Sequence, residues 1–415
     1  MRFLFFLASF LFFPFSFSQI EENNQTNQNN TNIEIIPDSV KREDKGYSND
    51  YLNEVEINEE KNQLKDKQRK KKDLKSRQFR ETKKKKLDLY KSSSCKSQSF
   101  IDANDKIMYN KIQSRSQSSQ RNPTPKQQLL MDDANQILEK EDPNSFEYNL
   151  NKYLIGNYNI SNYSNLQKAA ALKKNSPELQ RQMAAHHIII DNQKESKYYL
   201  NRLHENGILI NPSIDYCKDL LESVSQNGTL ITHGMIDSYG AHYNQINNHF
   251  RKDVQIINID FLQSDFYKKE LIAKGYKIPN SKNIDVAFFK KLCEMNKDKK
   301  LALSFTIPKD YFVSIQNHLF INGLIFEYHD NKPSKNLVQN NIDLWHSKMN
   351  KKVIYSMEKE TKNLASNYLP MLLTIKKFYK NTGNSKEELK MNIAIESISN
   401  ICGKNKHINK LKSAY

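Results

Sequence analysis

The chain has 415 residues, of which 64 are Lys or Arg and 47 are Asp or Glu, so its formal net charge is +17. Ten residues are glycine and no glycine-rich phosphate-binding loop occurs, which disfavours a nucleotide-binding enzyme. The four cysteines are far apart in the sequence, and their spacing excludes the common zinc-binding motifs.

Residues 1–18 are typical of a secretory signal peptide. Arg2 precedes an apolar run that begins at Phe3, and small residues follow it. The run contains Pro14 and is shorter than the roughly 18 residues needed to span a bilayer. We expect cleavage of the leader, export to the periplasm or cell envelope, and no transmembrane segment in the mature chain. The Asn-rich composition also fits an exported eukaryotic protein of an AT-rich genome.

Residues 19–124 are expected to form a disordered linker, Asn-rich at first and Lys-rich later. The segment has few large apolar side chains, so little burial is available to offset its ordering entropy. Its basic part is suited to an anionic surface or glycan. Because the protein is expected outside the cytoplasm and the basic residues lack interleaved aromatic side chains, nucleic acid is not a predicted partner.

Residues 125–226 show the apolar spacing of amphipathic helices. Leu166, Ala169 and Leu172 are expected on one helix face, and the pattern resumes at Leu179 after a turn. The period of ~34 residues resembles a tetratricopeptide-like repeat. Such a repeat predicts a groove for an envelope protein partner.

Residues 227–335 alternate between β-rich and helical segments. Apolar runs around Leu230 and Ile256 are separated by a helical pattern, an order that requires parallel pairing of the two strands. A third strand is predicted before Pro308, a helix over 309–319, and a fourth strand after Gly323. The fold class is therefore α/β, with a small, mainly parallel sheet and flanking helices.

Residues 336–415 are predicted to form a closing helical hairpin, similar to the tetratricopeptide-like hairpin before the sheet. The turn is expected at 381–384, with Leu372 on one helix opposing Ile393 and Ile395 on the other. The chain then consists of a disordered N-terminal third, helical hairpins, the α/β domain and a final hairpin.

The turn after the first strand is the candidate ligand site, because ligands of open α/β sheets bind where strand ends and helix N-termini converge. His233 and Asp237 lie there, and a pocket formed with Asp265 is one interpretation. The other is structural, with Asp237 or Ser238 capping the following helix. The ligand-binding candidates are His233, Asp237, Ser238, Tyr239, Asn258 and Asp265.

A metal site would draw on His233, Asp237, His242 and His249. His242 and His249 are seven residues apart, which separates them by about 10 Å along a helix axis. One ion cannot bridge that distance, so neither a metal nor a cofactor is predicted.

Ser238 as a nucleophile and paired carboxylates are the two catalytic hypotheses that these residues raise. Ser238 lacks the small residues on each side that a nucleophile elbow requires. Glycoside hydrolysis needs two carboxyl groups about 5 to 10 Å apart, and the sequence nominates Asp237, Asp260 and Asp265 without ranking them.

Three motifs follow one another in the chain: a Thr-x-Gly-x-x-Asp-Ser-Tyr turn, a strand that ends in Asn and a helix with Asp-Phe-Tyr. Their residues are Thr232, Gly234, Asp237, Ser238 and Tyr239, then Val254, Asn258, Leu262, Asp265 and Tyr267. In this order they resemble the soluble C-terminal region of bacterial protein O-mannosyltransferase-like membrane proteins, over residues 195–400. The resemblance implies a glycosylation-related role, but the membrane-embedded catalytic part of those proteins has no counterpart here.

The leading hypothesis is an exported, non-enzymatic cell-envelope protein that acts as a protein-binding or scaffold module. The alternative is a carbohydrate-binding or glycosylation accessory protein or enzyme with a pocket at the first strand-helix turn. A third hypothesis is a lipid- or wall-associated protein held by its Lys-rich segment. Cys217, Cys293 and Cys402 fit either a disulfide or free buried thiols.

Overall fold

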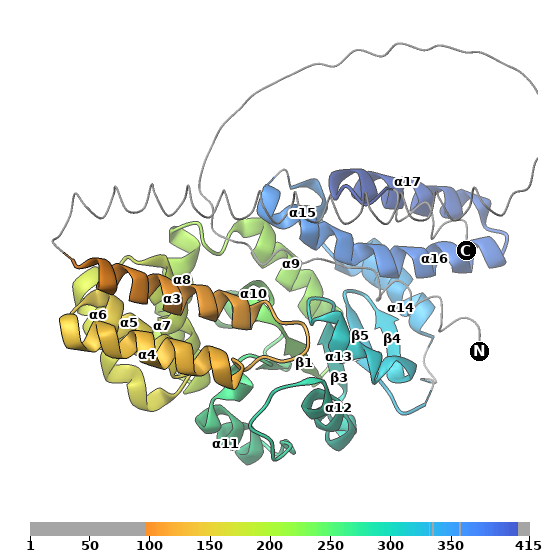
Figure 1. Cartoon of the computed structure of the whole chain (residues 1–415). Coiled ribbons are helices and arrows are strands. Elements are labelled where there is room, and N and C mark those ends of the chain that lie inside the picture. The colour runs from red at the N-terminus through yellow and green to blue at the C-terminus, as the bar shows by residue number, and fades with distance from the viewer. Residues whose placement is uncertain (1–95, 332, 334–335, 357, 406–415) are drawn as a thin grey trace, which may run out of the picture. The chain divides into compact units, whose positions relative to one another are not determined.

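The computed structural model describes residues 96–331, 333, 336–356 and 358–405. The expectations for the leader, the Asn-rich tract, the Lys-rich tract up to residue 95 and Cys95 lie outside the described residues. The described part is mostly helical and contains one small mixed sheet (Figure 1).

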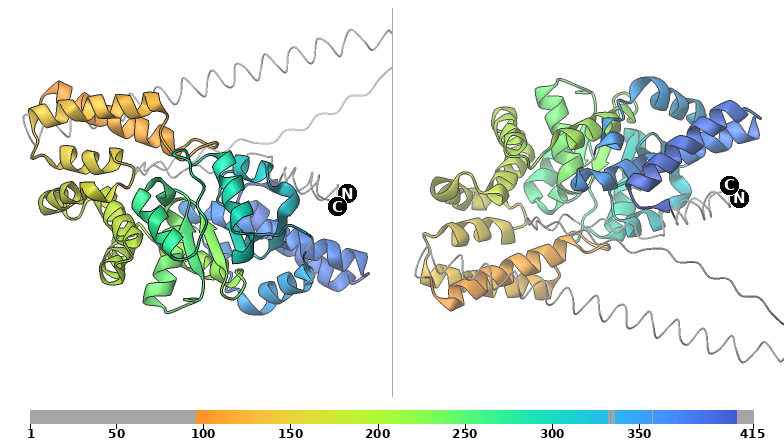
Figure 2. Two further views of the ribbon diagram at one scale, coloured as in Figure 1. Left: turned by 90° about the horizontal axis from the view of Figure 1, so that it is seen from below. Right: turned by 90° about the horizontal axis from the view of Figure 1, so that it is seen from above.

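The described chain begins with two paired helices, α3 (Gln98–Arg115) and α4 (Pro125–Glu141), which lie side by side in Figures 1 and 2. Phe100 and Ile107 of α3 are buried in one cluster with Met131 of α4. The expectation of disorder up to residue 124 is therefore wrong for α3. Its apolar residues are few but share one helix face, and α4 supplies the surface that buries them.

Consecutive helices α5 to α9 follow. Leu150, Leu166 and Leu179 lie in one buried cluster that joins α5, α6 and α7, whereas Leu172, expected on the same face, is 54% exposed. The tetratricopeptide-like character of these helices stays a prediction. The bounds are α5 (Phe146–Ile155), α6 (Tyr163–Lys173), α7 (Pro177–Ile189), α8 (Gln193–Glu205) and α9 (Asn211–Glu222).

Within the described residues, five strands form a sheet in the order β2-β1-β3-β5-β4. Leu230 pairs with Ile256 in parallel register, which confirms the predicted pairing of the first two strands. The pairs β1-β3 and β1-β2 are parallel, but β3-β5 and β5-β4 are antiparallel, so the sheet is mixed. The strands are β1 (Thr229–Thr232), β2 (Gln255–Asn258), β3 (Leu301–Ser304), β4 (Leu319–Asn322) and β5 (Ile325–Tyr328).

The antiparallel part arises from a hairpin that the sequence patterns did not predict. The helix expected over 309–319 ends early, and its last residue belongs to β4. Gly323 turns β4 into β5 with a φ of 62°, a conformation that glycine adopts without strain. The helix found there is α13 (Lys309–Val313).

Connections between the parallel strands create a topological switch point. Helix α10 links β1 to β2, whereas α11 and α12 lead from β2 to β3 on the other side of β1. The chain thus leaves β1 and β3 in opposite directions, and their carboxyl ends lie next to each other at Thr232 and Ser304. The helices are α10 (Gly234–Asn247), α11 (Asp265–Ala273) and α12 (Val286–Met295).

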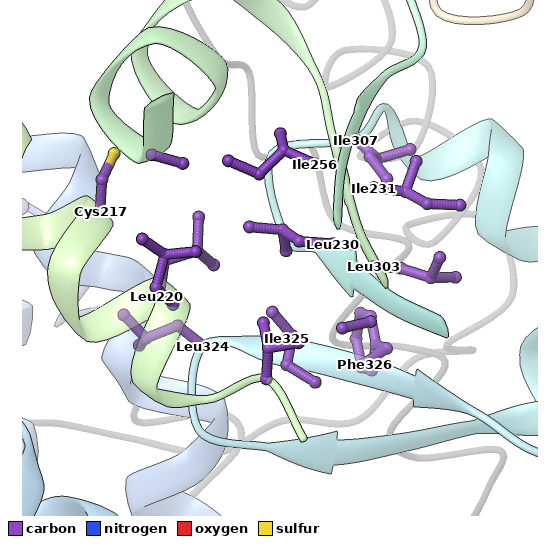
Figure 3. Packing of buried hydrophobic residues seen from close by; sticks show 14 of the residues in the cluster. Cys217, Leu220, Leu230, Ile231, Ile256, Leu303, Ile307, Leu324, Ile325 and Phe326 are labelled. Atoms are coloured by element: carbon purple, nitrogen blue, oxygen red, sulfur yellow. The ribbon is translucent and has the colours of Figure 1, made fainter. Parts of the chain in front are cut away.

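Both faces of the sheet are covered by apolar side chains (Figure 3). Leu230 points toward Leu220 of α9 on one face, and Ile231 points to the opposite face, as strand alternation requires. On β5, the Phe326 ring contacts the Phe312 ring of α13 at a centroid distance of 5.2 Å. The switch point is therefore the edge of a sheet buried on both sides.

The chain closes with helices that pack on one another (Figure 1). The turn between α16 and α17 lies at 382–384; Ile395 is buried as expected, but Ile393 is 59% exposed. The helices are α14 (Leu337–Asp343), α15 (Lys359–Ala365), α16 (Leu369–Asn381) and α17 (Ser385–Ile401). The short 3₁₀ segments are η1 (Ile160–Asn162), η2 (Phe261–Gln263), η3 (Lys297–Lys299), η4 (Gln316–His318), η6 (Lys352–Tyr355) and η7 (Ser366–Tyr368), and η5 (Leu344–Lys348) is a π-helix.

Cys217, Cys293 and Cys402 are free thiols, so the disulfide alternative does not describe this state. Among the residues that the structure places, no helix has both the length and the apolarity to cross a membrane.

Close packing of α9 on α10 makes Gly240 a sensitive position. A Cβ at Gly240 would overlap the Cys217 sulfur and lie 3.0 Å from its Cβ. We expect Gly240→Ala to lower the free energy of unfolding by about 1–3 kcal/mol, measured by urea denaturation. The same change in a Cys217→Ala background should cost clearly less, because the sulfur is gone. Equal costs in both backgrounds would refute this packing argument.

Candidate functional site at the carboxyl ends of the parallel strands

Asp237 occupies the switch point between β1 and β3. It lies in the first turn of α10 and has no exposed surface. Its Oδ2 accepts hydrogen bonds from the Ser304 hydroxyl at the end of β3 and from Thr306 Oγ1, at 2.5 Å in the latter case. The other oxygen, Oδ1, is buried and has no hydrogen-bond partner among the described residues.

The carboxyl of Asp237 is stabilised in its neutral form. Burial raises its pKa to about 6, although the hydroxyls of Ser304 and Thr306 act in the opposite direction. A buried polar atom without a partner costs about 1–3 kcal/mol, and few such atoms occur in native proteins. The uncompensated oxygen at the carboxyl ends of β1 and β3 is thus a feature that packing does not explain.

Two neighbouring side chains share this property. Ser238 Oγ and His233 Nε2 are also buried without a hydrogen-bond partner among the described residues. Burial, with help from the Arg121 guanidinium, lowers the pKa of His233 to about 4, so its ring is neutral at pH 7. The strand-helix turn therefore holds a neutral imidazole, a hydroxyl and a carboxyl group with unused hydrogen-bonding capacity.

The turn itself is held by Asn258, the last residue of β2, and by Asp260, which follows the strand. Asn258 Nδ2 donates to the carbonyl of Gly234 at 3.1 Å, and the Gly234 N–H donates to Asp260 Oδ2 at 3.1 Å. Gly234 has a φ of 71°, which lets β1 turn directly into α10. Both polar groups of the Gly234 residue are thus anchored to the adjacent strand end.

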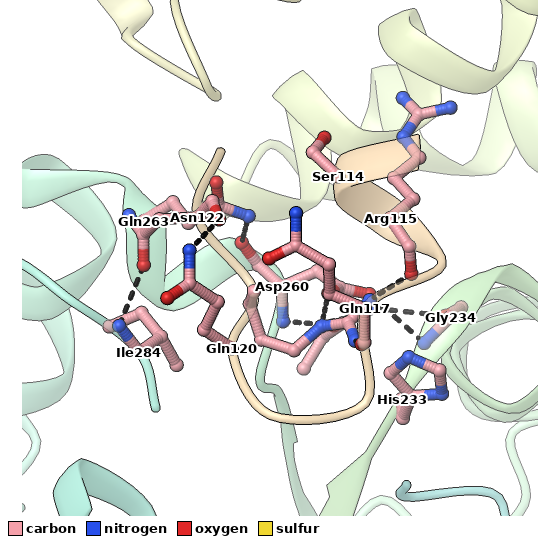
Figure 4. A network of polar contacts seen from close by, with 12 residues as sticks. Ser114, Arg115, Gln117, Gln120, Asn122, His233, Gly234, Asp260, Gln263 and Ile284 are labelled. Carbon is pink, nitrogen blue, oxygen red and sulfur yellow. Dashed lines mark hydrogen bonds and ion pairs between the residues drawn. The ribbon is translucent and has the colours of Figure 1, made fainter. Parts of the chain in front are cut away.

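Arg121, in the segment between α3 and α4, closes this edge. Figure 4 shows the polar network there, with Asp260 and Gly234 close to Gln117. Arg121 Nε lies 2.7 Å from Asp260 Oδ1, and the Arg121 side chain is 1% exposed. The guanidinium also donates to the backbone carbonyls of Arg115 and Gln117, both at 2.9 Å. The backbone N–H of Arg121 donates to the backbone carbonyl of Ile284 at 2.9 Å. The segment between α3 and α4 therefore borders the strand-helix turn and is bound to it.

The other two predicted site residues, Tyr239 and Asp265, differ in burial. Tyr239 is buried, and its hydroxyl donates to the carbonyl of Arg181 at 2.9 Å. Asp265 does not join the cluster: its side chain is 87% exposed and lies 2.7 Å from Lys268. It follows Ser264, which caps α11, so its side chain lies on the solvent side of the first turn.

The capping interpretation of the turn is wrong. Helix α10 begins at Gly234, so Asp237 and Ser238 lie beyond its first residues and neither caps it. The N-cap position is His233, which makes no side-chain cap hydrogen bond. Across the described ranges, no group of three or more His, Cys, Asp or Glu side chains could hold a metal ion.

Three residues of the site were missed by sequence analysis. Ser304 and Thr306 flank the end of the third predicted strand, and polar residues at that position were a usable signal because the strand was parallel to the first. Arg121 carried no such signal, since it lies in the segment expected to be disordered.

Comparison with known families adds one finding. Residues 213–408 match the family model described as TMEM260-associated domain 2. This region begins in α9 and includes the sheet and the C-terminal helices. No curated protein and no solved structure shows a significant match to the chain.

The raised pKa of Asp237 predicts a pH-dependent effect of its replacement. Its pKa is about 6 in the folded protein against 3.8 in the unfolded chain, so stability conferred by the proton is lost as the pH rises from 3.8 to 6. Asp237→Asn does not titrate. Relative to the wild type, this variant should therefore gain up to about 3 kcal/mol in unfolding free energy between pH 4 and pH 7.

Urea denaturation at the two pH values measures this difference. Asp133→Asn, which removes an exposed carboxylate on α4, controls for the change in net charge. A difference between Asp237→Asn and wild type that is the same at both pH values would contradict the assignment.

Proposed function

We propose that this chain is an exported, non-enzymatic accessory protein of glycosylation whose α/β domain binds a hydroxyl-rich ligand at the strand-helix turn after β1. The observation that carries the proposal is the buried Asp237 carboxyl group, which already accepts two hydroxyl hydrogen bonds and has one oxygen unused. Sugar hydroxyls offer the same donor chemistry as the Ser304 and Thr306 side chains.

The polar groups around Asp237 suit such a ligand. A neutral His233 ring presents one acceptor or donor nitrogen, and Ser238 presents a hydroxyl that both donates and accepts. Because Asp237 is fully buried, a ligand reaches it only after neighbouring residues move. Residues 116–124, which border the turn through Arg121, are the segment whose movement we propose.

Binding is favoured over hydrolysis by the state of the second carboxylate. Asp260 accepts from the Gly234 N–H and is paired with the Arg121 guanidinium. Burial alone would raise the pKa of Asp260, but Arg121 and His233 lower it below its usual range. Two-carboxylate glycoside hydrolysis needs one proton-donating acid and one base or nucleophile. Asp260 is unsuited to proton donation, and its oxygens are already engaged.

The motif resemblance to O-mannosyltransferase-like proteins supports a sugar as the ligand. The match of residues 213–408 to TMEM260-associated domain 2 covers the strand-helix turn, and the motif resemblance to O-mannosyltransferase-like proteins covers the same part of the chain. Export through the N-terminal leader and the tetratricopeptide-like character of the helices before the sheet belong to this proposal.

A protein-binding scaffold is the second candidate. Large apolar side chains are exposed on the two N-terminal helices, among them Tyr109 at 51% on α3 and Leu129 at 61% on α4. Exposed aromatic and aliphatic residues of this kind are enriched in protein interfaces.

Glycan binding by variants separates the two candidates. We expect the full mature chain to bind members of an array of neutral oligosaccharides that includes mannosides. Thr306→Val and Asp237→Asn should weaken this binding at least roughly tenfold, the loss typical of unpaired buried polar groups.

Asp133→Asn serves as the matched control, and circular dichroism verifies folding of each variant. Wild-type affinity in both site variants would refute the proposed site. Failure of the wild type to bind any glycan, together with loss of a protein partner on Tyr109→Asp and Leu129→Asp replacement, would favour the scaffold.

A further inference from the structure

The tripeptide Asn159-Ile160-Ser161, which follows α5, matches the acceptor pattern for N-linked glycosylation. The pattern is an Asn followed two residues later by Ser or Thr, with a residue other than Pro between them. It also begins at Asn162 and Asn227, and at Asn24 and Asn29 outside the described residues. Because so short a pattern also arises by chance, the surroundings of each Asn decide whether the folded chain has room for a sugar.

Asn159 presents its amide nitrogen to solvent. Asn159 and Ser161 are both exposed and lie in the connection between α5 and α6. Asn159 Oδ1 accepts a hydrogen bond from the Ser161 N–H at 3.0 Å, which fixes the side-chain amide over the turn. Asn159 Nδ2, the atom that carries the sugar in N-linked glycans, makes no hydrogen bond within the described residues. The acceptor nitrogen is therefore held on the surface and is not used by the fold.

The residues before Asn159 anchor this loop to the rest of the protein. The Asn157 side chain accepts from Lys111 Nζ at 2.6 Å and donates to Gln128 Oε1 at 2.9 Å. The Tyr158 ring packs edge-on against Phe261 at a centroid distance of 5.2 Å. These contacts face the protein, whereas the side chain of the next residue, Asn159, is exposed. A sugar on Asn159 Nδ2 thus leaves the anchoring contacts of the loop in place.

The other two acceptor patterns of the described chain are placed differently. Asn162 Nδ2 donates to a backbone carbonyl of α5 at 3.1 Å and packs so closely on Gly156 that an added Cβ there would overlap it. A sugar on this nitrogen would displace that packing. In the pattern that begins at Asn227, the hydroxyl residue is Thr229 of β1, which is 2% exposed and lies 2.7 Å from the Tyr276 hydroxyl. That pattern is covered once β1 has joined the sheet.

We propose that Asn159 is a site of N-linked glycosylation. The donor is an oligosaccharide joined through a diphosphate to a lipid. A bond forms between Asn159 Nδ2 and C1 of the first sugar, the bond from C1 to the phosphate oxygen breaks, the amide nitrogen loses one proton, and the lipid diphosphate leaves. Because the reaction spares Oδ1, the hydrogen bond from the Ser161 N–H is retained. The inference rests on the export in the proposed function, and not on the ligand site at Asp237.

The alternative is an Asn159 that only shapes the loop, since Asn side chains often accept from the N–H two residues later. The two roles use different atoms of Ser161. The turn needs its backbone N–H, whereas the acceptor pattern needs its hydroxyl. Ser161→Ala therefore keeps the turn and removes the pattern, and Ser161→Thr keeps both. Ser164→Ala, at another exposed position, removes only the pattern that begins at Asn162 and is the matched control.

Secretion of the full chain with its own leader from cultured insect cells tests the inference. A peptide N-glycosidase in water enriched in heavy oxygen converts each glycosylated Asn to a labelled Asp, which peptide mass spectrometry locates. We expect the label at Asn159 in most wild-type molecules, and at least roughly tenfold less of it in Ser161→Ala. Ser161→Thr and Ser164→Ala should both be labelled at Asn159 as the wild type is.

A secreted wild-type chain without label at Asn159 overturns the inference, and so does label that persists there in Ser161→Ala. If Ser161→Ala fails to fold, the wild type and Ser161→Thr decide, and absence of label at Asn159 in both overturns it. A chain that stays inside the cell with its leader uncleaved overturns both this inference and the proposed export. A chain labelled at Asn159 that binds no oligosaccharide supports this inference and refutes only the ligand site at Asp237.

Discussion

The ion pair between Arg121 and Asp260 connects the two halves of the described chain. Arg121 lies in the segment between α3 and α4, and Asp260 follows β2. The guanidinium also donates to the backbone carbonyls of Arg115 and Gln117, and the carboxylate accepts from the Gly234 N–H at the start of α10. Removing one partner of such a buried pair typically costs about 3–5 kcal/mol. The geometry of the strand-helix turn depends on this contact.

Two polar regions meet at this ion pair. On one side are the unused hydrogen-bonding groups of His233, Asp237 and Ser238, and on the other are the basic residues of α3. Arg121 touches both, since it donates to the backbone of Arg115 and bears on the pKa of His233. Movement of its segment would therefore alter both regions together, which is why we propose it as the part that admits a ligand.

The fold could be predicted where patterns are local. The apolar runs around Leu230 and Ile256, separated by one helix, required a parallel pair, and the pairing is found in that register. The β4 strand was missed because the apolar residues from Tyr311 to Leu319 fit a helix as well as a strand. The strand forms because the turn at Gly323 lets β4 pair with β5. Helix α3 was missed because a basic, weakly apolar sequence forms a helix here only by burying its narrow apolar face on α4.

The site was predictable only in outline. The strand-helix turn and Asp237 follow from topology, since ligand sites of open sheets lie at strand carboxyl ends. The partners of Asp237 are 67 and 69 residues away, and Arg121 is 139 residues from Asp260, separations at which a single sequence carries no pairing signal. Asp265 illustrates the converse error, because a matching motif position said nothing about which way the side chain points.

A double-mutant cycle on Arg121 and Asp260 tests this account most directly. Urea denaturation of Arg121→Met, Asp260→Asn and the double variant measures their coupling energy. We expect each single variant to lose several kcal/mol and the double variant to lose much less than the sum, with a coupling of about 2 kcal/mol or more. Losses that add within about 0.5 kcal/mol would show that the two residues do not interact, and the linkage between the N-terminal helices and the sheet edge would then be wrong.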